Sequence, residues 1–553
     1  MNNLVIVESN AKASKIKGYL DSKFPEDNWQ VNACLGHICD LSNEEKAVNP
    51  DDWEDLKWAD TTKGKKVIKE LTKLCKENDS IFLATDPDRE GEAIAWHLNN
   101  KFEKKKLLKD KSVSRISFTE ITPSAIEEAI KNPREIDQNL VEAYLARRIL
   151  DHLIGFKVSP FLWRHISRAK SAGRVQSPSL RIVCEKEDEI DAFIPEEYWP
   201  FSGKFNYKDF QVDADLTSIN GEKIEKKRVS NETEAKQIEN ELNSQSFYLK
   251  EIESKPQSNS SKAPFRTSTL QQAASSKLSF TADRTMRVAQ KLYEDGLITY
   301  LRTDGISISN DILNDLRNYI SSEYGEKYLS EKPKIYKSKA ANSQEAHEPI
   351  RPTDFSIKPS KAKLAGDEMK LYSLIWNRTL ASQMSNSKYE RKTLIISSKD
   401  EKYIFRASSR KNLFLGFELL TKEEDADETA TEFPENLKEQ EELILKEINF
   451  EQKFTTPPRR YSEASLIKKM EEEGIGRPST YASILKNLRE KKYTYGAKSI
   501  TPSDLGRVLS SYLKFIFKDF FIEDKFTADM EKELDKISSG EISWTNVLDK
   551  FWE

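Results

Sequence analysis

The stretch from Ile81 to Leu98 (IFLATDPDREGEAIAWHL) constrains the fold of this chain more than any other. It opens with four apolar residues, which is typical of a buried strand. From Glu92 onward it has the apolar spacing of an amphipathic helix. Pro87 fixes its own φ and biases Asp86 toward extended geometry, so we expect this carboxylate at the strand end. The sequence therefore predicts a strand, an acidic turn and a helix.

Three carboxylates occupy alternate positions in this turn: Asp86, Asp88 and Glu90. Acids crowded at the end of a strand repel one another unless a cation lies between them. The stretch offers oxygen ligands and no thiolate, and Mg²⁺ prefers such a set, keeping water and substrate phosphate oxygens as further ligands. The alternative is a solvated acidic turn, which the helix dipole alone would favour.

A second strand is predicted at Leu4–Val7, directly before Glu8 and a helix that continues to about Leu20. Strand and helix patterns alternate throughout residues 1–135, which indicates a parallel α/β domain. In an open α/β sheet, ligands gather at the carboxyl ends of the strands. Glu8 and the acidic triplet would therefore share one site if their strands are neighbours.

A basic segment, residues 147–181, lies within a region of helical pattern that begins near Asp137. It holds eight Lys or Arg residues against one acid, Asp151, although the whole chain has a net charge of −4. Lys and Arg neutralise phosphates, while hydroxyl and amide groups such as Ser177 and Gln176 fix the register of a nucleic-acid backbone. A solvated helical face is the alternative, but such faces normally alternate in sign.

A second chemical centre is predicted in Leu297–Asp304 (LITYLRTD), a short apolar strand or turn. A phenol is a poor nucleophile at its free pKa, and Arg302 would stabilise charge on Tyr300 and hold a phosphate beside it. A packed ring with a bonded hydroxyl is the alternative. The loop EAHEPIRP adds His347 and Arg351, although His347 alone is equally well explained as a structural histidine.

The pattern along the 553 residues changes from α/β to basic helices, β, helices, β and helices again. A β-rich region split around a helical one indicates an insertion, with residues 194–259 and 388–460 as one domain and 260–387 hanging from it. Residues 254–262 are predicted to be a hinge or boundary, and 421–434 an acidic flexible loop. The four cysteines form no CxxC pair and no apolar run approaches a membrane span, so we expect a cytoplasmic protein without a membrane partner.

Segments from residue 4 to about residue 551 resemble the type IA DNA topoisomerases, most closely the bacterial topoisomerase I group. LVIVESNAKA and ATDPDREGEAIAWHL are similar to the two halves of the family's Toprim acidic site. Further similar strings follow in the family's order: LARRILDHLIGFKVSPFLW, SAGRVQSPSLRIVCEKEDEI, FRTSTLQQAAS, LYEDGLITYLRTD, EAHEPIRPTD, GIGRPSTYASIL and FTADMEKELDKISSG.

The resemblance implies a toroidal ring of α/β, helical and β domains around a hole large enough for DNA. The implied reaction is ATP-independent relaxation of negatively supercoiled DNA through transient cleavage of one strand, a 5′-phosphotyrosine link, strand passage and religation. The expected partner is a single-stranded segment of supercoiled duplex, the expected state a monomer and the expected location the nucleoid. Four domains are implied: a Toprim catalytic domain (1–36 and 61–136), a helical DNA-binding domain (37–60, 137–193 and 461–553), a β-rich hinge or arch (194–259 and 388–460) and a helical domain with the nucleophilic tyrosine (260–387).

The family's functional roles fall on three groups of residues in this sequence. The implied catalytic residues are Tyr300 as nucleophile with Glu8, Lys12 and Arg302. The implied Mg²⁺ ligands are Glu8, Asp86, Asp88 and Glu90. The implied DNA contacts are Arg147, Arg148, Asp151, Arg174, Gln176, Ser177, His347, Arg351, Arg477, Ser479 and Thr480.

Some features depart from the family pattern or leave alternatives open. Asn10 stands where the family usually has Pro. Gly305 stands where a small hydroxyl residue often follows the Thr-Asp pair. The chain ends at Glu553 without four-cysteine zinc ribbons. We therefore expect either a core cut from a longer protein or a naturally short, phage-encoded form. A topoisomerase III-like decatenase is the near alternative. A Toprim nuclease or primase would need no Tyr300 block, and a non-catalytic DNA-binding protein would tolerate loss of both Glu8 and Tyr300.

Overall fold

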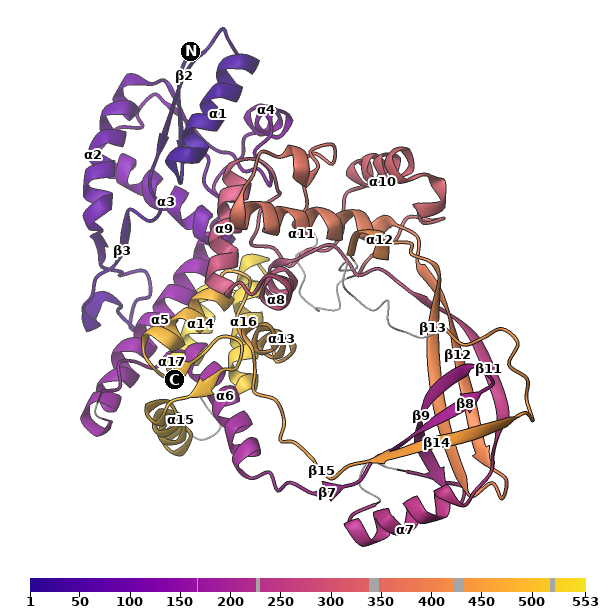
Figure 1. Ribbon diagram of the computed structural model, residues 1–553. Helices are drawn as coiled ribbons and strands as arrows, with labels where there is room; N and C mark the ends of the chain where they lie inside the picture. The colour runs from indigo at the N-terminus through magenta and orange to yellow at the C-terminus, as the bar shows by residue number, and fades with distance from the viewer. Residues whose placement is uncertain (167, 225–228, 338–347, 422–431, 518–522) are drawn as a thin grey trace.

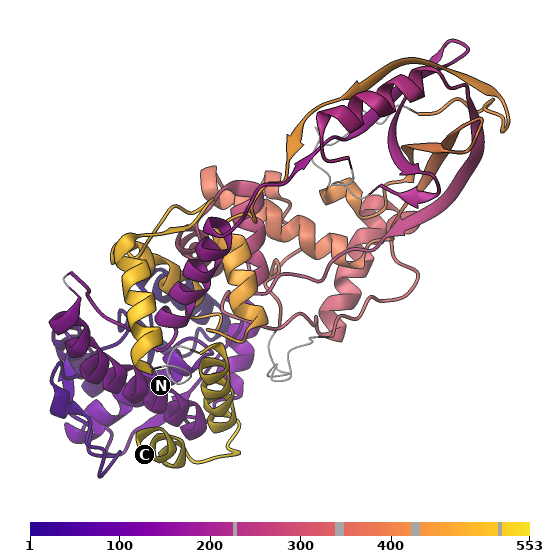
Figure 2. The same cartoon turned by 90° about the horizontal axis from the view of Figure 1, so that it is seen from below.

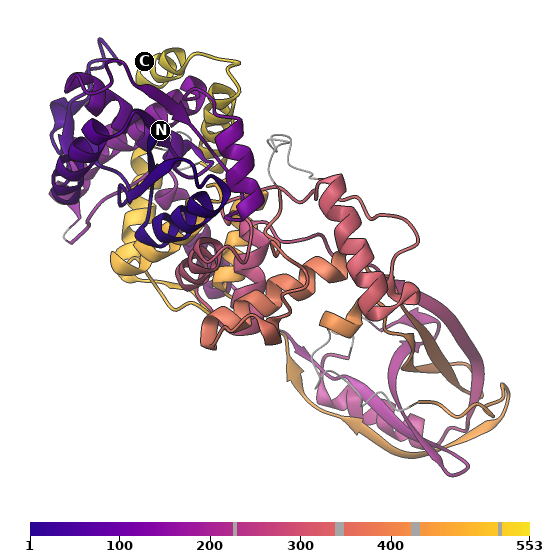
Figure 3. The same cartoon turned by 90° about the horizontal axis from the view of Figure 1, so that it is seen from above.

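The computed structural model describes residues 1–166, 168–224, 229–337, 348–421, 432–517 and 523–553. The chain closes a ring around a central opening, with an α/β unit and many helices on one side and a β unit on the other (Figure 1). Views from below and above show the β unit projecting away from the end that carries both termini (Figures 2 and 3). The predicted toroidal combination of α/β, helical and β parts is confirmed.

The N-terminal unit is built on a four-stranded sheet in the order β2-β1-β5-β6, in which all neighbours are parallel. The carboxyl ends of β1 and β5 therefore meet at one edge, as a shared acidic site requires. The elements of this unit are β1 (Asn2–Val7), α1 (Asn10–Lys23), β2 (Asn28–Ala33), α2 (Thr62–Glu77), β5 (Ser80–Leu83), α3 (Arg89–Lys104), β6 (Ser112–Arg115) and α4 (Pro123–Lys131).

Helices from the middle and the end of the chain pack together beside this sheet, with α16 and α17 against α5 and α15 against α6. Residues 37–60 join them, because Leu41, Val48 and Trp53 share a buried cluster with α5, α16 and α17. The elements are β3 (Cys39–Leu41), η1 (Glu45–Ala47), β4 (Trp58–Asp60), α5 (Gln138–His165), α6 (Gln176–Asp191), α13 (Glu463–Glu472), α14 (Tyr481–Glu490), β16 (Thr494–Tyr495), β17 (Thr501–Pro502), α15 (Asp504–Phe517), α16 (Asp524–Ser538) and α17 (Trp544–Trp552).

The β unit is an antiparallel sheet in the order β10-β9-β13-β12-β11-β14-β8, and it closes on itself because β8 also pairs with β9. Aromatic side chains fill its interior, among them Phe205, Phe247 and Phe405. The elements are β7 (Glu197–Tyr198), β8 (Phe201–Tyr207), β9 (Phe210–Ile219), β10 (Glu222–Lys223), α7 (Glu232–Asn243), β11 (Phe247–Asn259), β12 (Ser387–Ser398), β13 (Tyr403–Phe414), α12 (Glu418–Thr421), β14 (Glu442–Phe450) and β15 (Lys453–Phe454).

Between β11 and β12 the chain forms the helical unit that carries Tyr300. Tyr300 itself lies after α9, next to an isolated bridge between Ile298 and Pro352. The elements are α8 (Thr267–Leu278), α9 (Ala282–Glu294), α10 (Asn310–Tyr324), η2 (Glu326–Tyr328), η3 (Pro359–Lys361) and α11 (Gly366–Gln383).

One hydrophobic cluster crosses from the α/β unit to the tyrosine-bearing unit. Side chains from β1, α1 and α4, such as Ile16 and Ile126, are buried in the same cluster as Leu292, Tyr293 and Tyr300. The two units therefore share a continuous apolar contact in this closed ring.

The structure differs from the sequence prediction mainly in the β region. The expected hinge at 254–262 is wrong for its first part, because β11 runs to Asn259 and pairs with β12 along its length. Backbone hydrogen bonds to the neighbouring strand stabilise this polar, largely exposed segment, although its side chains do not have a strand-like pattern. Helix α7 interrupts the predicted β stretch, and most of the expected acidic loop lies outside the described residues. All four cysteines are buried and free. No helix among the described residues is long and apolar enough to cross a membrane.

Candidate active site

The acidic edge of the sheet brings together Glu8, which directly follows β1, and Asp86, which follows β5. The Asp86 backbone N–H donates to Glu8 Oε1 over 2.9 Å. The Lys12 ammonium, almost fully buried at 1% exposure, pairs with the Asp86 carboxylate. Burial, followed by the charge of Asp86, raises the pKa of Glu8 to about 8. Burial alone would lower the pKa of Lys12, but Asp86 and Glu8 raise it above its ordinary value, so the lysine stays charged.

Asp88 caps the helix that follows. Its Oδ1 accepts a hydrogen bond of 2.8 Å from the Gly91 backbone N–H, and α3 begins at Arg89. A Cβ at Gly91 would lie only 2.1 Å from the Asp86 carbonyl oxygen, so the tight turn requires glycine here. The predicted acidic turn is confirmed, with Asp86 outside the helix and Asp88 at its N-cap.

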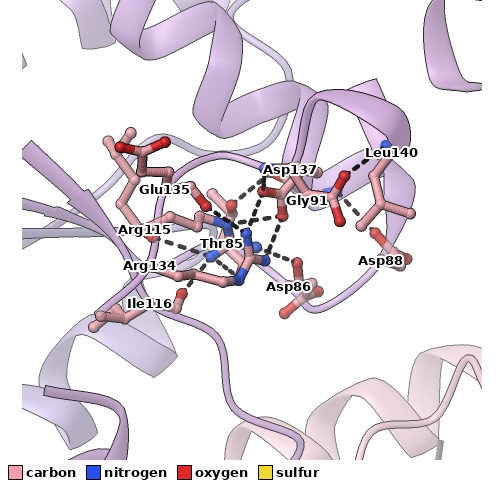
Figure 4. A network of polar contacts seen from close by, with 12 residues as sticks. Thr85, Asp86, Asp88, Gly91, Arg115, Ile116, Arg134, Glu135, Asp137 and Leu140 are labelled. Carbon is pink, nitrogen blue, oxygen red and sulfur yellow. Dashed lines mark hydrogen bonds and ion pairs between the residues drawn. The ribbon is translucent and has the colours of Figure 1, made fainter. Parts of the chain in front are cut away.

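A buried arginine holds this turn in place (Figure 4). Arg115 donates to the backbone carbonyls of Leu83 and Thr85 at 3.0 and 2.9 Å and to that of Asp86 at 2.8 Å. Its Nε also donates to Glu92 Oε2 at 3.0 Å. Both charged side chains are buried, so the strand end carrying Asp86 is fixed by a fully enclosed ion pair.

The phenol of Tyr300 faces these acids across the boundary between the two units. Its hydroxyl donates to Asp88 Oδ2 over 2.6 Å, and its backbone N–H donates to the Thr119 carbonyl over 2.7 Å. Burial and the charges of Asp88 and Asp86 raise the pKa of Tyr300 well above its ordinary value, while Arg302 opposes this shift. In this state the phenol is therefore held in its protonated form.

Arg302 reaches the third acid of the triplet. Its Nη1 lies 2.6 Å from Glu90 Oε2 and 3.5 Å from Asp88 Oδ2. His37 contacts the other Glu90 oxygen at 3.3 Å. Contacts from His37 and then Arg302, which outweigh the effect of burial, lower the pKa of Glu90 to about 2.

A cavity of about 480 Å³ opens beside these groups. Five arginines and six carboxylates line it, so its cationic groups are already balanced by acids of the chain. The sequence-predicted residues that line it are Asp88, Glu90, Arg147, Arg148, Asp151, Arg302, Arg477, Ser479 and Thr480.

Other predicted DNA contacts lie deeper or elsewhere. Arg174 and Ser177 are buried, at 1% and 3% exposure, and Gln176 accepts a hydrogen bond from Lys491. Arg351 is buried and pairs with Glu348 and, at 3.2 Å, with Glu120. His347 lies outside the described residues. The roles of all these residues in binding DNA stay predictions.

The sequence analysis missed several residues that line the cavity, among them His37, Tyr144, Arg89 and Asp535. His37 was detectable only in part, since the one local signal is Gly36, which directly precedes it. Two successive left-handed residues, Leu35 (φ 59°) and Gly36 (φ 89°), turn the chain so that His37 meets Glu90. No local pattern marked Tyr144, which stacks on His37 at a ring distance of 5.4 Å.

The carboxylates suit Mg²⁺ by their chemistry, since all are hard oxygen donors and the charge of Asp86 already disfavours ionisation of Glu8. No three His, Cys, Asp or Glu side chains within the described ranges converge into a ready-made metal cage. Mg²⁺ typically uses one or two carboxylates together with waters and substrate phosphates, so the arrangement fits this ion.

Comparison with known proteins agrees with this architecture. The profile of a family described as DNA topoisomerase matches residues 135–549, and that of the Toprim domain matches residues 3–121. A Toprim unit and a tyrosine-bearing unit closed into one ring define the type IA class of DNA topoisomerases. The chain is 47% identical over 564 residues to DNA topoisomerase 1 of Rickettsia bellii (strain RML369-C), covering 99% of this chain and 70% of that protein.

More distant relatives give the same result. The chain is 44% identical over 558 residues to DNA topoisomerase 1 of Zymomonas mobilis subsp. mobilis, covering 99% of this chain and 45% of that protein. The structure matches full-length topoisomerase I from Thermotoga maritima with a TM-score of 0.84 and 38% identity, over 99% of this chain and 89% of that one. The chain belongs to the bacterial DNA topoisomerase I family, and it is an isomerase with type IA relaxation activity.

Proposed function

We propose that this protein relaxes negatively supercoiled DNA by cutting one strand with Tyr300, without ATP. The observation that carries the proposal is the 2.6 Å contact between the Tyr300 hydroxyl and Asp88, which joins the phenol to the acidic edge of the sheet. A single-stranded segment of the duplex would lie in the adjoining cavity, with its scissile phosphate beside the phenol and the acids.

In the cleavage step, the Tyr300 oxygen attacks phosphorus and the bond from phosphorus to the 3′-oxygen breaks. The 5′-phosphate is then linked to the tyrosine, which conserves the bond energy for religation. The phenol proton passes to Asp88, its hydrogen-bond acceptor, or to water. Arg302 turns from Glu90 toward the phosphate and stabilises the charge that develops on the phenol and the phosphoryl oxygens.

The departing 3′-oxygen needs a proton, and Glu8, Lys12 and water are the candidates. The raised pKa of Glu8, about 8, means that its carboxyl holds a proton near neutral pH when no metal is bound. Lys12 is tied to Asp86, where it neutralises charge beside the phosphate. These two environments favour Glu8 as the acid.

Asp86 and Asp88, joined by Glu8 once it has given up its proton, would hold Mg²⁺, and Glu90 holds Arg302 until the strand binds. When bound, the ion would offset the repulsion between the carboxylates and polarise the phosphate. The cavity arginines and the Ser479 and Thr480 hydroxyls would contact the backbone of the strand.

We further propose that the four domains implied by the sequence act as a gate. The tyrosine-bearing domain, 260–387, would move away from the Toprim domain while the cut strand stays bonded to it. We expect the protein to work as a monomer on the nucleoid in the cytoplasm.

The test is oligonucleotide cleavage on a denaturing gel with wild type and Tyr300→Phe. The variant should fold and bind single-stranded DNA but form no covalent adduct, because it lacks the attacking oxygen. Tyr293→Phe is the matched control, since its hydroxyl is also buried against the Toprim unit, where it donates to the Phe118 carbonyl at 3.3 Å. An adduct formed by Tyr300→Phe would refute the assignment.

A further inference from the structure

Four arginines from four separate segments meet beside the cavity. Arg89 begins α3, Arg147 lies in α5, Arg174 precedes α6 and Arg477 precedes α14. Three of them line the cavity, and Arg174 lies fully buried behind them. Guanidinium groups always carry charge and repel one another, so this gathering needs carboxylates to hold it.

Helix α16 supplies a buried carboxylate at this point. Glu531 has no exposed surface, and its Oε1 lies 2.6 Å from Arg174 Nη1 and 3.8 Å from Arg147 Nη2. Its Oε2 lies 3.9 Å from Arg477 Nε. One carboxylate therefore contacts guanidinium groups of three different segments.

A second carboxylate, Asp535, lies one turn further along the same face of α16. Its Oδ2 accepts a hydrogen bond of 2.8 Å from Arg477, and its Oδ1 pairs with Arg89. Arg89 stands between Asp88 and Glu90 in the sequence. Asp535 thus ties the acidic turn of the sheet to α16 and to the segment before α14, which also line the cavity.

We propose that Glu531 and Asp535 are positioning residues of the topoisomerase reaction. They hold the guanidinium groups of Arg89, Arg147 and Arg477 where the phosphates of the bound strand come to lie. The inference rests on the proposed function, in which this cavity takes the strand.

The energetics of the cluster support a role beyond stability. Buried ion pairs contribute little net stability, because desolvation offsets the attraction. Within the described residues, Arg174 Nη2 and Glu531 Oε2 also have no protein hydrogen-bond partner, so the cluster does not use all of its hydrogen-bonding capacity. The three cavity arginines keep 17 to 24% of their side-chain surface exposed, so a phosphate can reach them.

The test is Asp535→Asn, which keeps the shape of the side chain and removes its charge. Cleavage of a saturating single-stranded oligonucleotide should fall at least tenfold, because Arg89 and Arg477 lose their common anchor. Affinity for the same oligonucleotide, measured in a Tyr300→Phe background at about 50 mM salt, should not weaken. The slope of log affinity against log salt concentration should become steeper by roughly 0.7, because removal of one carboxylate leaves one more positive charge available for phosphate.

Asp529→Asn is the matched control. Asp529 lies on the same helix but pairs with Lys532 on an exposed surface, so we expect wild-type cleavage and salt dependence. Glu531→Gln tests the second carboxylate, and thermal unfolding reports whether each variant keeps its fold.

Two outcomes would overturn the proposal. Wild-type cleavage by both Asp535→Asn and Glu531→Gln would remove the positioning role. If Asp535→Asn lowered DNA binding, cleavage and the thermal unfolding midpoint together, the cluster would have only a structural role. Arg477→Ala separates this inference from the proposed function. Unchanged binding and cleavage by Arg477→Ala would show that the strand lies elsewhere. Weakened binding and cleavage by Arg477→Ala, beside normal Asp535→Asn and Glu531→Gln variants, would refute positioning and leave the proposed function standing.

Discussion

Replacing Arg115 by lysine should loosen the acidic turn while leaving a positive charge in place. The guanidinium donates to Glu92 and to four backbone carbonyls, those of Leu83, Thr85, Asp86 and Ile116. An ammonium has three donors on a single nitrogen and cannot span these acceptors. At least two of these five hydrogen bonds would be lost.

The expected cost follows from that count. Leaving a buried acceptor without a partner costs about 1–3 kcal/mol, so two of them amount to about 2–6 kcal/mol in the local stability of the turn. Arg134 also pairs with Glu92 and would keep this carboxylate partly compensated. The Leu83 carbonyl likewise keeps its bond from the Ile116 backbone N–H, so we take about 3 kcal/mol, in the lower half of the range. This corresponds to roughly a hundredfold faster local opening.

Hydrogen exchange of the 553-residue chain is the suitable measurement, because a chain of several domains has no single unfolding free energy. Amides of the peptide covering 81–92 should exchange about a hundred times faster in Arg115→Lys, and oligonucleotide cleavage should fall with them. Arg134→Lys is the control, since its side chain is 38% exposed and water can replace its bonds. Unchanged protection in Arg115→Lys, or an equal effect of both substitutions, would refute the reasoning.

Three further predictions concern pH, metal and gate opening. The pKa of a glutamate is 4.5 in the unfolded chain but about 8 for Glu8 in the folded protein. Protonated Glu8 therefore contributes fully to the stability of the fold below pH 4.5, and this contribution is lost as the pH rises to about 8. The thermal midpoint of the metal-free wild type should fall over that range relative to Glu8→Gln, and parallel curves would contradict the shift. Excess EDTA should abolish plasmid relaxation and Mg²⁺ should restore it, so undiminished relaxation in EDTA would argue against the proposed metal. Glu120→Gln should weaken the contact with Arg351 by about 1 kcal/mol and make gate opening roughly fivefold more frequent in single-molecule extension measurements, with oligonucleotide cleavage unchanged. Equal opening rates would exclude this pair as a latch.

Local features of the acidic edge could be predicted because the signals are local. The apolar run of β5, the restriction that Pro87 imposes and the N-cap at Asp88 all act within a few residues. The alternation of strands and helices left open whether the strands before Glu8 and Asp86 are neighbours, and the pairing of β1 with β5 shows that they are. The contact between Tyr300 and Asp88 spans 212 positions, and only the resemblance to a family placed the two together.

The basic segment shows what a charge count along the chain cannot reveal. Its arginines read as a free cationic face, yet Arg148 forms a bidentate pair with Asp40, and Arg174 lies against Glu531. These partners come from segments 108 and 357 positions away. Tertiary folding therefore converts an apparent surface of positive charge into a preorganised set of ion pairs.

The apolar cluster that α1 and α4 share with the tyrosine-bearing helices should make the activation enthalpy of strand passage depend on temperature. Separation of the two units would expose to water apolar side chains that are buried in the closed ring. Hydration of apolar surface has a large positive heat capacity. The activation enthalpy of passage should therefore grow on warming, whereas cutting a short oligonucleotide, which leaves the units together, should keep a nearly constant one.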